Sequence, residues 1–247
     1  MTLEGHTAFV SGAGRNIGRA IAIALAESGC NVVVNGYTDP AACEAVAGEL
    51  EQRGVRALTV IGDVGDAGDV RRMAAEALGA FGTVDVVVNN AAIRPRQPLL
   101  EMSEDDWHRV MAVDLHAAFY TTKAFVPGMV ERTWGRIISF TGMNAIAGHG
   151  GRSHVSTAKH GVWGFTKSLA IELGPSGITA NAISPGPINT TRDDPEFAKH
   201  IKSQVERVPV RRLGESEDIA ALCVFLASPQ AGFICGQMIA SNGGMTT

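Results

Sequence analysis

The stretch Ser11-Gly12-Ala13-Gly14-Arg15-Asn16-Ile17-Gly18 decides the fold of this chain. It follows an apolar run at residues 7–10 and precedes an Ala/Ile/Leu-rich pattern of helical period that extends to Glu27. The stretch therefore lies where a first strand turns into a first helix. Glycines there permit a tight turn, and the free N–H groups at the helix start face an anion such as a dinucleotide pyrophosphate. Glycine-rich turns are common, so the rest of the chain has to decide between a structural turn and a phosphate-binding loop.

Short β-branched runs alternate with longer helical patterns along the whole chain. We expect strands at residues 7–10, 31–35, 57–63, 84–89, 135–140 and 178–184, and helices at 18–27, 41–53, 67–81, 104–130, 154–173 and 217–227. Such repeated units require right-handed crossovers and a buried parallel sheet. The expected fold class is α/β, a single Rossmann-type doubly wound parallel sheet with helices on both faces. Residues 1–247 are expected to form one dinucleotide-binding domain.

Composition excludes several classes of partner. The chain has 247 residues, 45% of them hydrophobic, and a net charge of -4, which leaves no basic surplus for nucleic acid or an anionic membrane. No apolar run is long enough for a membrane helix, and the first strand leaves no room for a signal peptide, so we expect a cytoplasmic protein. The four cysteines, Cys30, Cys43, Cys223 and Cys235, show no metal-site spacing, and we expect them to be reduced and mostly buried, with no metal site.

Polar and glycine-containing segments follow the expected strands, at the sheet edge where ligands bind in this architecture. They are Asp63-Val64, Asn89-Asn90-Ala91-Ala92, Gly142 and the run from Pro185 to Thr190. These segments and the opening glycine stretch resemble the short-chain dehydrogenase/reductase family over essentially the whole chain. The further matching residues are Lys159, Arg136-Ile137-Ile138, Arg212-Leu213-Gly214, Gly236-Gln237 and Asn242-Gly243-Gly244. The resemblance implies a bound nicotinamide dinucleotide and, usually, a homotetramer.

The resemblance also implies which residues hold that cofactor. Asp63 matches the residue that contacts adenine, and Asn89 matches one that stabilises the central strands. Ile188 and Thr190 match the residues that hold the nicotinamide carboxamide. The expected cofactor-binding residues are Gly12, Gly14, Arg15, Ile17, Gly18, Asp63, Val64, Asn89, Ala91, Lys159, Pro185, Gly186, Ile188 and Thr190.

The end of the second strand favours NADP over NAD. An acidic residue there would bind the ribose hydroxyls of NAD and repel the phosphate of NADP. This chain has Asn35-Gly36-Tyr37, with no carboxylate before Asp39. It also has Arg15 in the glycine stretch, where similar NADP-using members carry an arginine for the 2′-phosphate. We therefore expect NADP, with NAD as the alternative.

The resemblance breaks at the catalytic residues. Family members use a serine, a tyrosine and a lysine four residues after the tyrosine, supported by an asparagine. Alignment on Lys159 without gaps puts Gly142 at the serine position, Val155 at the tyrosine position and Asp114 at the asparagine position. Valine donates no proton and glycine polarises no carbonyl, so the standard mechanism does not carry over. If that loss is the main defect, Val155→Tyr with Gly142→Ser should restore ketone reduction.

Three residues are the candidate catalytic groups: Lys159, Asp114 and His149. Asp114 is expected either to act as a base or to pair with Lys159 and neutralise it. His154 points away from the Lys159 face at about 100° per residue, so we expect a packing or surface histidine. Ser156 and Lys159 have the S-x-x-K spacing of serine acyl-transfer enzymes, which is the weaker hypothesis.

The loops beside these positions predict a substrate pocket. Its expected residues are Arg94, Gly142, Met143, Asn144, Arg152 and Val155, and His149 and Arg96 lie in the same loops. Convergent cations there would suit an anionic substrate, although long charged side chains on loops are often simply solvated.

Three functions follow as hypotheses. The first is an NADP-linked oxidoreductase for a small carbonyl or alcohol substrate, possibly anionic, whose acid/base group has moved to His149 or to a water near Lys159. The second is a lyase or hydrolase that reuses the pocket. The third is a catalytically silent dinucleotide-binding subunit or sensor. The persistence of the run from Pro185 to Thr190 favours the first. We also expect a homotetramer or dimer built on the helix at 217–227 and a terminal strand at 233–238.

Overall fold

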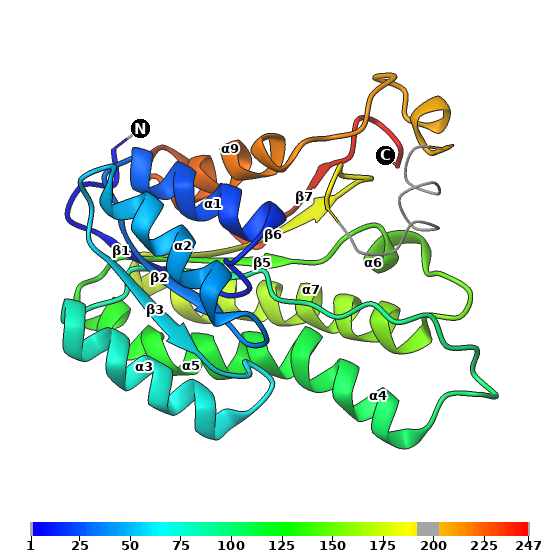
Figure 1. Cartoon of the computed structure of the whole chain (residues 1–247), viewed down its shortest axis with the longest axis horizontal. Helices are drawn as coiled ribbons and strands as arrows, with labels where there is room; N and C mark the ends of the chain where they lie inside the picture. The colour runs from blue at the N-terminus through cyan, green and yellow to red at the C-terminus, as the bar shows by residue number, and fades with distance from the viewer. Residues whose placement is uncertain (1, 192–202, 247) are drawn as a thin grey trace.

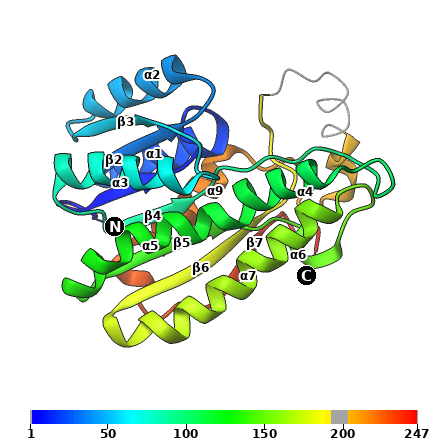
Figure 2. The same cartoon turned by 90° about the horizontal axis from the view of Figure 1, so that it is seen from below.

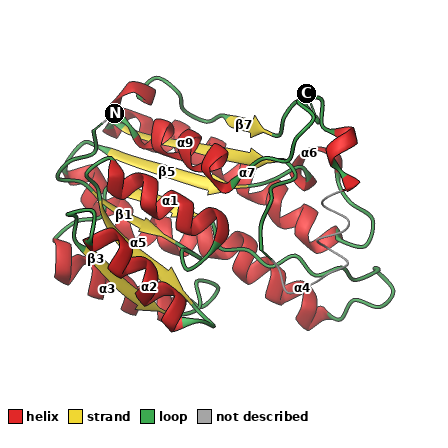
Figure 3. Ribbon diagram, turned by 45° about the horizontal axis from the view of Figure 1, so that its top comes forward, coloured by secondary structure: helices red, strands yellow, loops and turns green. Residues whose placement is uncertain are grey.

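A parallel sheet of seven strands forms the centre of the molecule in the computed structural model, which describes residues 2–191 and 203–246. The strands are β1 (Thr7–Val10), β2 (Asn31–Gly36), β3 (Ala57–Ile61), β4 (Val86–Asn89), β5 (Gly135–Phe140), β6 (Ile178–Pro185) and β7 (Met238–Ser241). Their order is β3-β2-β1-β4-β5-β6-β7, and every neighbouring pair is parallel (Figure 3). The strand order reverses between β1 and β4, which is the point where such sheets open a crevice for ligands.

Helices cover both faces of this sheet, as Figures 1 and 2 show. One face carries α1 (Asn16–Glu27), α2 (Pro40–Glu51) and α9 (Ser216–Ala227), and the other carries α3 (Ala67–Phe81), α5 (Ala117–Glu131) and α7 (Ser153–Leu173). The helix α4 (Glu104–Met111) packs on α7, and the short α6 (Asn144–Ala147) precedes α7. The predicted α/β doubly wound fold is therefore confirmed.

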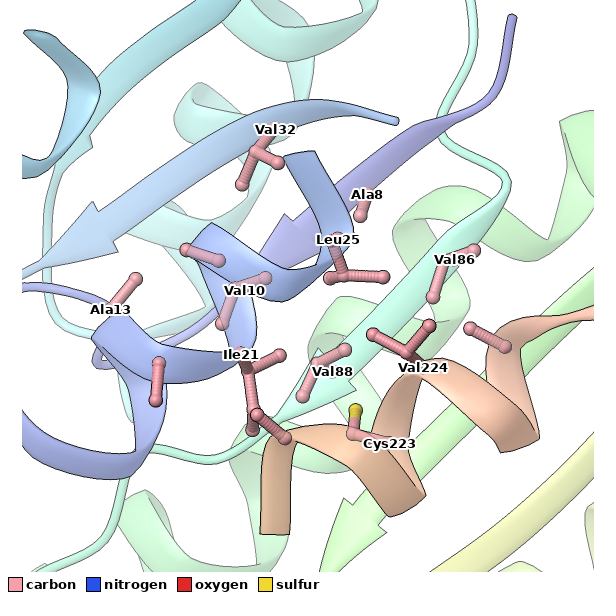
Figure 4. Close-up of a cluster of buried hydrophobic side chains, with 14 of the residues drawn as sticks. Ala8, Val10, Ala13, Ile21, Leu25, Val32, Val86, Val88, Cys223 and Val224 are labelled. Carbon is pink, nitrogen blue, oxygen red and sulfur yellow. The ribbon is translucent and has the colours of Figure 1, made fainter. Parts of the chain in front are cut away.

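The core on the α1 side explains why the first strand and helix form where they do. Ile21 and Leu25 recur on one face of α1 and are fully buried against Val10 of β1 and Val88 of β4, and Cys223 of α9 closes the cluster (Figure 4). Helical spacing and strand alternation thus place the apolar residues of separate segments in one core. This core holds the glycine stretch rigidly at the start of α1.

Side-chain caps fix where several helices begin. Asp39 accepts from the backbone N–H of Ala42 at the start of α2, and Asp66 accepts from that of Asp69 at the start of α3. Ser103 and Asp106 form a reciprocal capping box at the start of α4. Each side chain satisfies backbone donors that the first helical turn leaves without partners.

Two predicted elements differ from the structure. The helix expected at 104–130 contains a π-helical turn at Ala112–His116, which separates α4 from α5 and turns Asp114 inward until it is 3% exposed. The terminal strand expected at 233–238 is β7 at Met238–Ser241, because Gly236 has a φ of +74° and the extended strand begins only after it. The other predicted strands and helices lie within a few residues of their predicted bounds.

The helix α9, on which a subunit contact is expected, packs one side against α1. Ile219 and Leu226 are fully buried, and they belong to the core cluster formed with α1.

The cysteines are unpaired: Cys30, Cys43 and Cys223 are buried and Cys235 is half-buried. In the described part of the chain no helix has the length and apolar character needed to cross a membrane.

Candidate functional site

The glycine stretch has a backbone that larger residues cannot adopt. Gly12 has a φ of +62°, and Asn16 has a φ of +49°, a region that asparagine tolerates better than most residues. A Cβ atom on Gly18 would overlap the carbonyl oxygen of Gly12, and one on Gly14 would lie 3.0 Å from Sγ of Cys43. The turn thus requires glycine where α1 begins, and its backbone donors are available to an anion.

A cavity of about 900 Å³ opens beside this turn at the carboxyl ends of the strands. Its lining includes most of the predicted cofactor-binding residues, namely Gly12, Gly14, Arg15, Ile17, Gly18, Asp63, Val64, Ala91 and Thr190. Asn89 and Lys159 line a much smaller neighbouring cavity instead. The lining of these two cavities includes none of Pro185, Gly186 and Ile188.

The end of β2 leaves no room for a carboxylate. A Cβ atom on Gly36 would overlap Sγ of Cys43, which is buried at the second turn of α2. Burial raises the pKa of the Cys43 thiol, with the nearby Asp39 and Glu44 carboxylates adding to the effect, so the thiol is neutral. The exposed Arg15 lines the same part of the cavity.

Sequence reasoning missed Arg109, which lines the cavity from α4. Its guanidinium forms an ion pair with Asp63 and lies 5.9 Å from the centre of the Tyr37 ring. The residue expected to contact adenine is therefore already paired with a cation. No family motif includes Arg109, and its contacts join segments 46 and 72 residues away, so the sequence contained no signal for them.

A hydrogen-bond network joins the glycine turn to the end of β4. The Asn90 side chain donates to the backbone oxygens of Ser11 and Gly12 at 2.9 and 3.1 Å, and the Ser11 hydroxyl accepts from the N–H groups of Asn90 and Ala91. Asn89 accepts from the Thr121 hydroxyl at 2.6 Å. The Ser11 and Asn90 bonds tie the ends of β1 and β4 together at the crevice, and the Asn89 bond ties the end of β4 to α5.

The segment after β6 closes the opposite side of the cavity. A Cβ atom on Gly186 would lie 2.6 Å from Cα of Asn242, and Ile188 is 7% exposed and pairs with Gly214. Beyond it, the Asn16 side chain accepts from the N–H of Thr191 at 3.0 Å and donates to its carbonyl oxygen at 3.1 Å. The glycine turn and the segment after β6 are thus bound to each other across the cavity.

Lys159 and Asp114 form a buried ion pair. Nζ of Lys159 lies 3.3 Å from Oδ2 of Asp114 and donates to the carbonyl oxygen of Phe140 at 3.0 Å, and both residues are at most 4% exposed. The other Asp114 oxygen accepts from the N–H of Ile93 at 2.8 Å. The direct pairing expected from the sequence is therefore present, and the amine of Lys159 is turned into the protein.

The positions that match the family's serine and tyrosine are unlike a substrate pocket. Val155 is fully buried with Val110 and Ala158 in a small apolar cluster, and it does not line either of the two cavities described above. Gly142 has open space around its Cα, but its φ of +101° strains any L side chain. Met143 is half-buried, and Asn144 begins α6.

The remaining predicted pocket residues lie on two loops. Arg94 lines the large cavity, and Arg152 directly precedes α7 without capping it through its side chain. His149 is exposed, with Nδ1 2.8 Å from the carbonyl oxygen of Gly150. His154 is fully buried, with Nε2 3.1 Å from Oε1 of Gln97, so it packs between the loops as expected.

The residues around the large cavity fit a dinucleotide. Glycines occupy the positions where a Cβ atom would fill the cradle, backbone donors at the start of α1 suit a pyrophosphate, and the crevice lies at the reversal of strand order.

Known proteins share this sequence and architecture. A family model described as enoyl-(acyl carrier protein) reductase matches residues 12–246. The 3-oxoacyl-[acyl-carrier-protein] reductase FabG of Staphylococcus epidermidis is 39% identical over 245 residues, covering 97% of this chain and 98% of that protein. The BbsD subunit of (2S)-[(R)-hydroxy(phenyl)methyl]succinyl-CoA dehydrogenase of Thauera aromatica is 36% identical over 244 residues, covering 99% and 98%.

A solved structure of a candidate short-chain alcohol dehydrogenase from Sinorhizobium meliloti 1021 superposes with a TM-score of 0.94. It is 30% identical in sequence, and the match covers 99% of this chain and 97% of that one. Sequence, fold and the position of the glycine turn agree, and the chain belongs to the short-chain dehydrogenase/reductase family of oxidoreductases.

Proposed function

We propose that this protein is an NADP-dependent oxidoreductase that acts on a small carbonyl or alcohol substrate without the family's serine and tyrosine. The observation that carries the cofactor choice is the end of β2, where Cys43 fills the space that a carboxylate at Gly36 would need while Arg15 lines the cavity. Membership of the family supports a nicotinamide dinucleotide as the cofactor, which would supply or accept the hydride.

The chain's own residues bind and orient that cofactor. Backbone N–H groups at the start of α1 face the pyrophosphate, and the guanidinium of Arg15 supplies charge for the 2′-phosphate. Asn16 and Thr191 are bound to each other across the cavity and line it on that side. None of these binding roles requires a side chain at Gly142 or Val155, the positions that match the family's serine and tyrosine.

Proton transfer is assigned to His149. Its imidazole is exposed on the loop before α7, and an imidazole ring can both accept and donate a proton. Lys159 and Asp114 neutralise each other inside the protein, so we give that pair a structural role. His149→Gln should lower kcat by about 100-fold, whereas His160→Gln, an exposed histidine on α7 bonded to its own helix, should not.

Calorimetry tests the cofactor proposal. NADP(H) should bind more tightly than NAD(H), and Arg15→Ala should narrow the difference, because it removes the charge for the phosphate. Arg71→Ala is the matched control, since Arg71 is an exposed arginine on α3. Equal affinities in the unaltered protein, or tighter NAD binding, would overturn the choice of NADP.

A catalytically silent dinucleotide-binding protein is the second candidate, and the burial of Lys159 is the observation that favours it. Following nicotinamide absorbance with a panel of small ketones and alcohols separates the two. Consumption of cofactor supports the oxidoreductase, while tight binding without any absorbance change supports the silent protein. Substrate turnover without an absorbance change would instead indicate a lyase or hydrolase.

We further propose one domain, a cytoplasmic location and a homotetramer or dimer. Phe233 is fully exposed and Ile171 is 82% exposed, and apolar side chains of this size are typical of subunit contacts. Light scattering at micromolar concentration checks the assembly, and a monomer would contradict it.

A further inference from the structure

We infer that Arg94, Arg96 and Arg152 form a binding site for a negatively charged group of the substrate, a carboxylate or a phosphate. The inference rests on the proposed function, because it specifies the class of carbonyl or alcohol that the protein accepts. The site would hold the substrate at the mouth of the cofactor cavity.

Two loops bring these arginines together. The backbone N–H of Gln97, beside Arg96, donates to the carbonyl oxygen of Gly151, beside Arg152, at 2.8 Å. A Cβ atom on Gly151 would lie 3.3 Å from Cγ of Arg96 and 3.5 Å from its Nε. The buried bond between His154 and Gln97 holds the same two loops together. In Figure 1 the loop before α4 and the loop between α6 and α7 lie at the same end of the molecule.

The three guanidinium groups have no counter-charge of their own. In the described residues none of them forms an ion pair or a side-chain hydrogen bond, whereas Arg19, Arg72 and Arg212 are each paired with a carboxylate. Asp114 is the acidic group that faces Arg94, and it is already paired with Lys159. Like charges held together are unfavourable, so a bound anion would relieve their repulsion.

The pKa of Arg152 is lowered by its surroundings. Burial lowers the pKa of Arg152, and the positive charges of Arg94 and Arg96 lower it further. This effect agrees with the loop contacts in placing the three side chains close together.

Buried donors without partners lie at the start of α7, next to Arg152 in the chain. Nε of Arg152 and the hydroxyl oxygens of Ser153 and Ser156 are buried without hydrogen-bond partners. The helix α7, of 21 residues, begins at Ser153, and its N-terminal residue Arg152 makes no capping bond with its side chain. Buried donors without partners cost free energy, and an oxyanion at this point would accept from them.

The chemistry of the site selects the ligand. Guanidinium groups bind carboxylates and phosphates in a planar, bidentate manner, which a neutral carbonyl compound does not reproduce. Arg94 lines the cofactor cavity, so an anion held by this cluster lies beside the cofactor. The substrate class is therefore an oxo acid, a hydroxy acid or a phosphorylated ketone or alcohol.

The experiment uses the full-length protein saturated with NADP and compares charged with neutral probes by calorimetry. The carboxylate arm pairs pyruvate, acetoacetate and levulinate with their methyl esters, and the phosphate arm pairs dihydroxyacetone phosphate with dihydroxyacetone. The charged member of at least one pair should bind about tenfold more tightly. Arg152→Gln and Arg94→Gln should remove most of that difference, and Arg71→Gln should leave it unchanged.

The outcomes separate this inference from the proposed function. Equal binding of charged and neutral probes in every pair, with NADP still bound, would overturn the anion site and leave the oxidoreductase standing. Charge-dependent binding that is lost in the arginine variants, with no oxidation of NADPH when the same charged ketones are mixed with the protein and the reduced cofactor, would support the site and count against the proposed redox activity. Should Arg152→Gln fail to fold, the exposed Arg94 provides the same test.

Discussion

The two ends of the cavity differ in how much of a short-chain dehydrogenase/reductase they retain. At the glycine turn, Gly14 and Gly18 have no space for a larger side chain, because a Cβ atom would lie 3.0 Å from Sγ of Cys43 or overlap the carbonyl oxygen of Gly12. At the other end, Gly142 and the buried Val155 stand where the resemblance predicts the serine and the tyrosine, and Lys159 is paired with Asp114. The function proposed above therefore requires that this fold can bind its cofactor without the family's usual proton-transfer residues.

The contrast also teaches how a lost catalytic residue is accommodated. A buried lysine needs a partner for its charge, and the carboxylate of Asp114 supplies one at 3.3 Å. Small apolar residues fill the volume around Val155. The region around Val155 and Lys159 is thus closely packed. Substitutions at four places in the molecule test the contrast between this region and the glycine turn.

Loss of the Asp114 charge should have the largest effect. Asp114→Asn keeps the hydrogen bond to the N–H of Ile93 but leaves Lys159 as a buried cation, so the free energy of unfolding should fall by about 3 kcal/mol. The double variant with Lys159→Met should recover most of the loss. Urea denaturation measures both, and Glu76→Gln in the exposed pair with Arg72 is the control, with an expected loss below about 1 kcal/mol. A loss no greater than the control's would contradict a structural role for the pair.

At the opposite end, Gly18→Ala should weaken NADP binding by about 100-fold, close to 3 kcal/mol, because the new Cβ atom displaces the turn that faces the pyrophosphate. Gly79→Ala is the matched control, since no atom lies within 4 Å of a Cβ atom placed there on α3. That control should bind NADP normally. Calorimetry that found unchanged affinity in Gly18→Ala would place the cofactor elsewhere.

Restoring the family's hydroxyls should fail, contrary to what the sequence suggested. Val155→Tyr introduces a ring into a fully packed cluster and should cost about 1–3 kcal/mol of stability. Gly142→Ser adds strain at a φ of +101°. Thermal denaturation of Val155→Tyr is compared with that of Val130→Tyr, which changes a partly exposed valine on α5. Ketone reduction by a stable double variant would show that the catalytic end is still open.

The smallest expected effect concerns the choice of cofactor. Gly36→Asp alone forces a carboxylate against Sγ of Cys43, whereas the double variant with Cys43→Ala has room for it. The double variant should shift the ratio of NADP to NAD affinity toward NAD by about tenfold. Cys43→Ala alone is the control and should leave the ratio unchanged. A ratio unaffected by the new carboxylate would mean that this end of β2 does not face the ribose.

Much of the fold was predictable because its signals are local. The apolar run at β1, the glycine turn and the period of α1 lie within one continuous segment, and so their elements were placed correctly. The π-helical turn at Asp114 was not predictable from the sequence, because it depends on contacts with distant segments. The Asp114 carboxylate points inward and contacts the N–H of Ile93, in the loop after β4, and the amine of Lys159 on α7. Likewise, β7 begins late because of the left-handed conformation of Gly236, which the sequence pattern does not specify.

The candidate site likewise contains residues that sequence motifs predicted and residues that they did not. The cavity is lined by the glycine turn, Asp63 and Thr190, all found through motifs of known order. Arg109 was missed because its ion pair with Asp63 depends on how α4 lies over the sheet. The burial of Val155 was not predicted, because helical geometry gives the direction of a side chain but not whether a neighbouring helix covers it.

The two bonds between Asn16 and Thr191 have a consequence for kinetics. Both residues line the cavity, from opposite sides of the reversal in strand order, and bonds of 3.0 and 3.1 Å join them. If the cofactor passes between them, these bonds have to open before it enters or leaves. Asn16→Ala is then expected to raise both the association and the dissociation rate of NADP, which stopped-flow measurements would show.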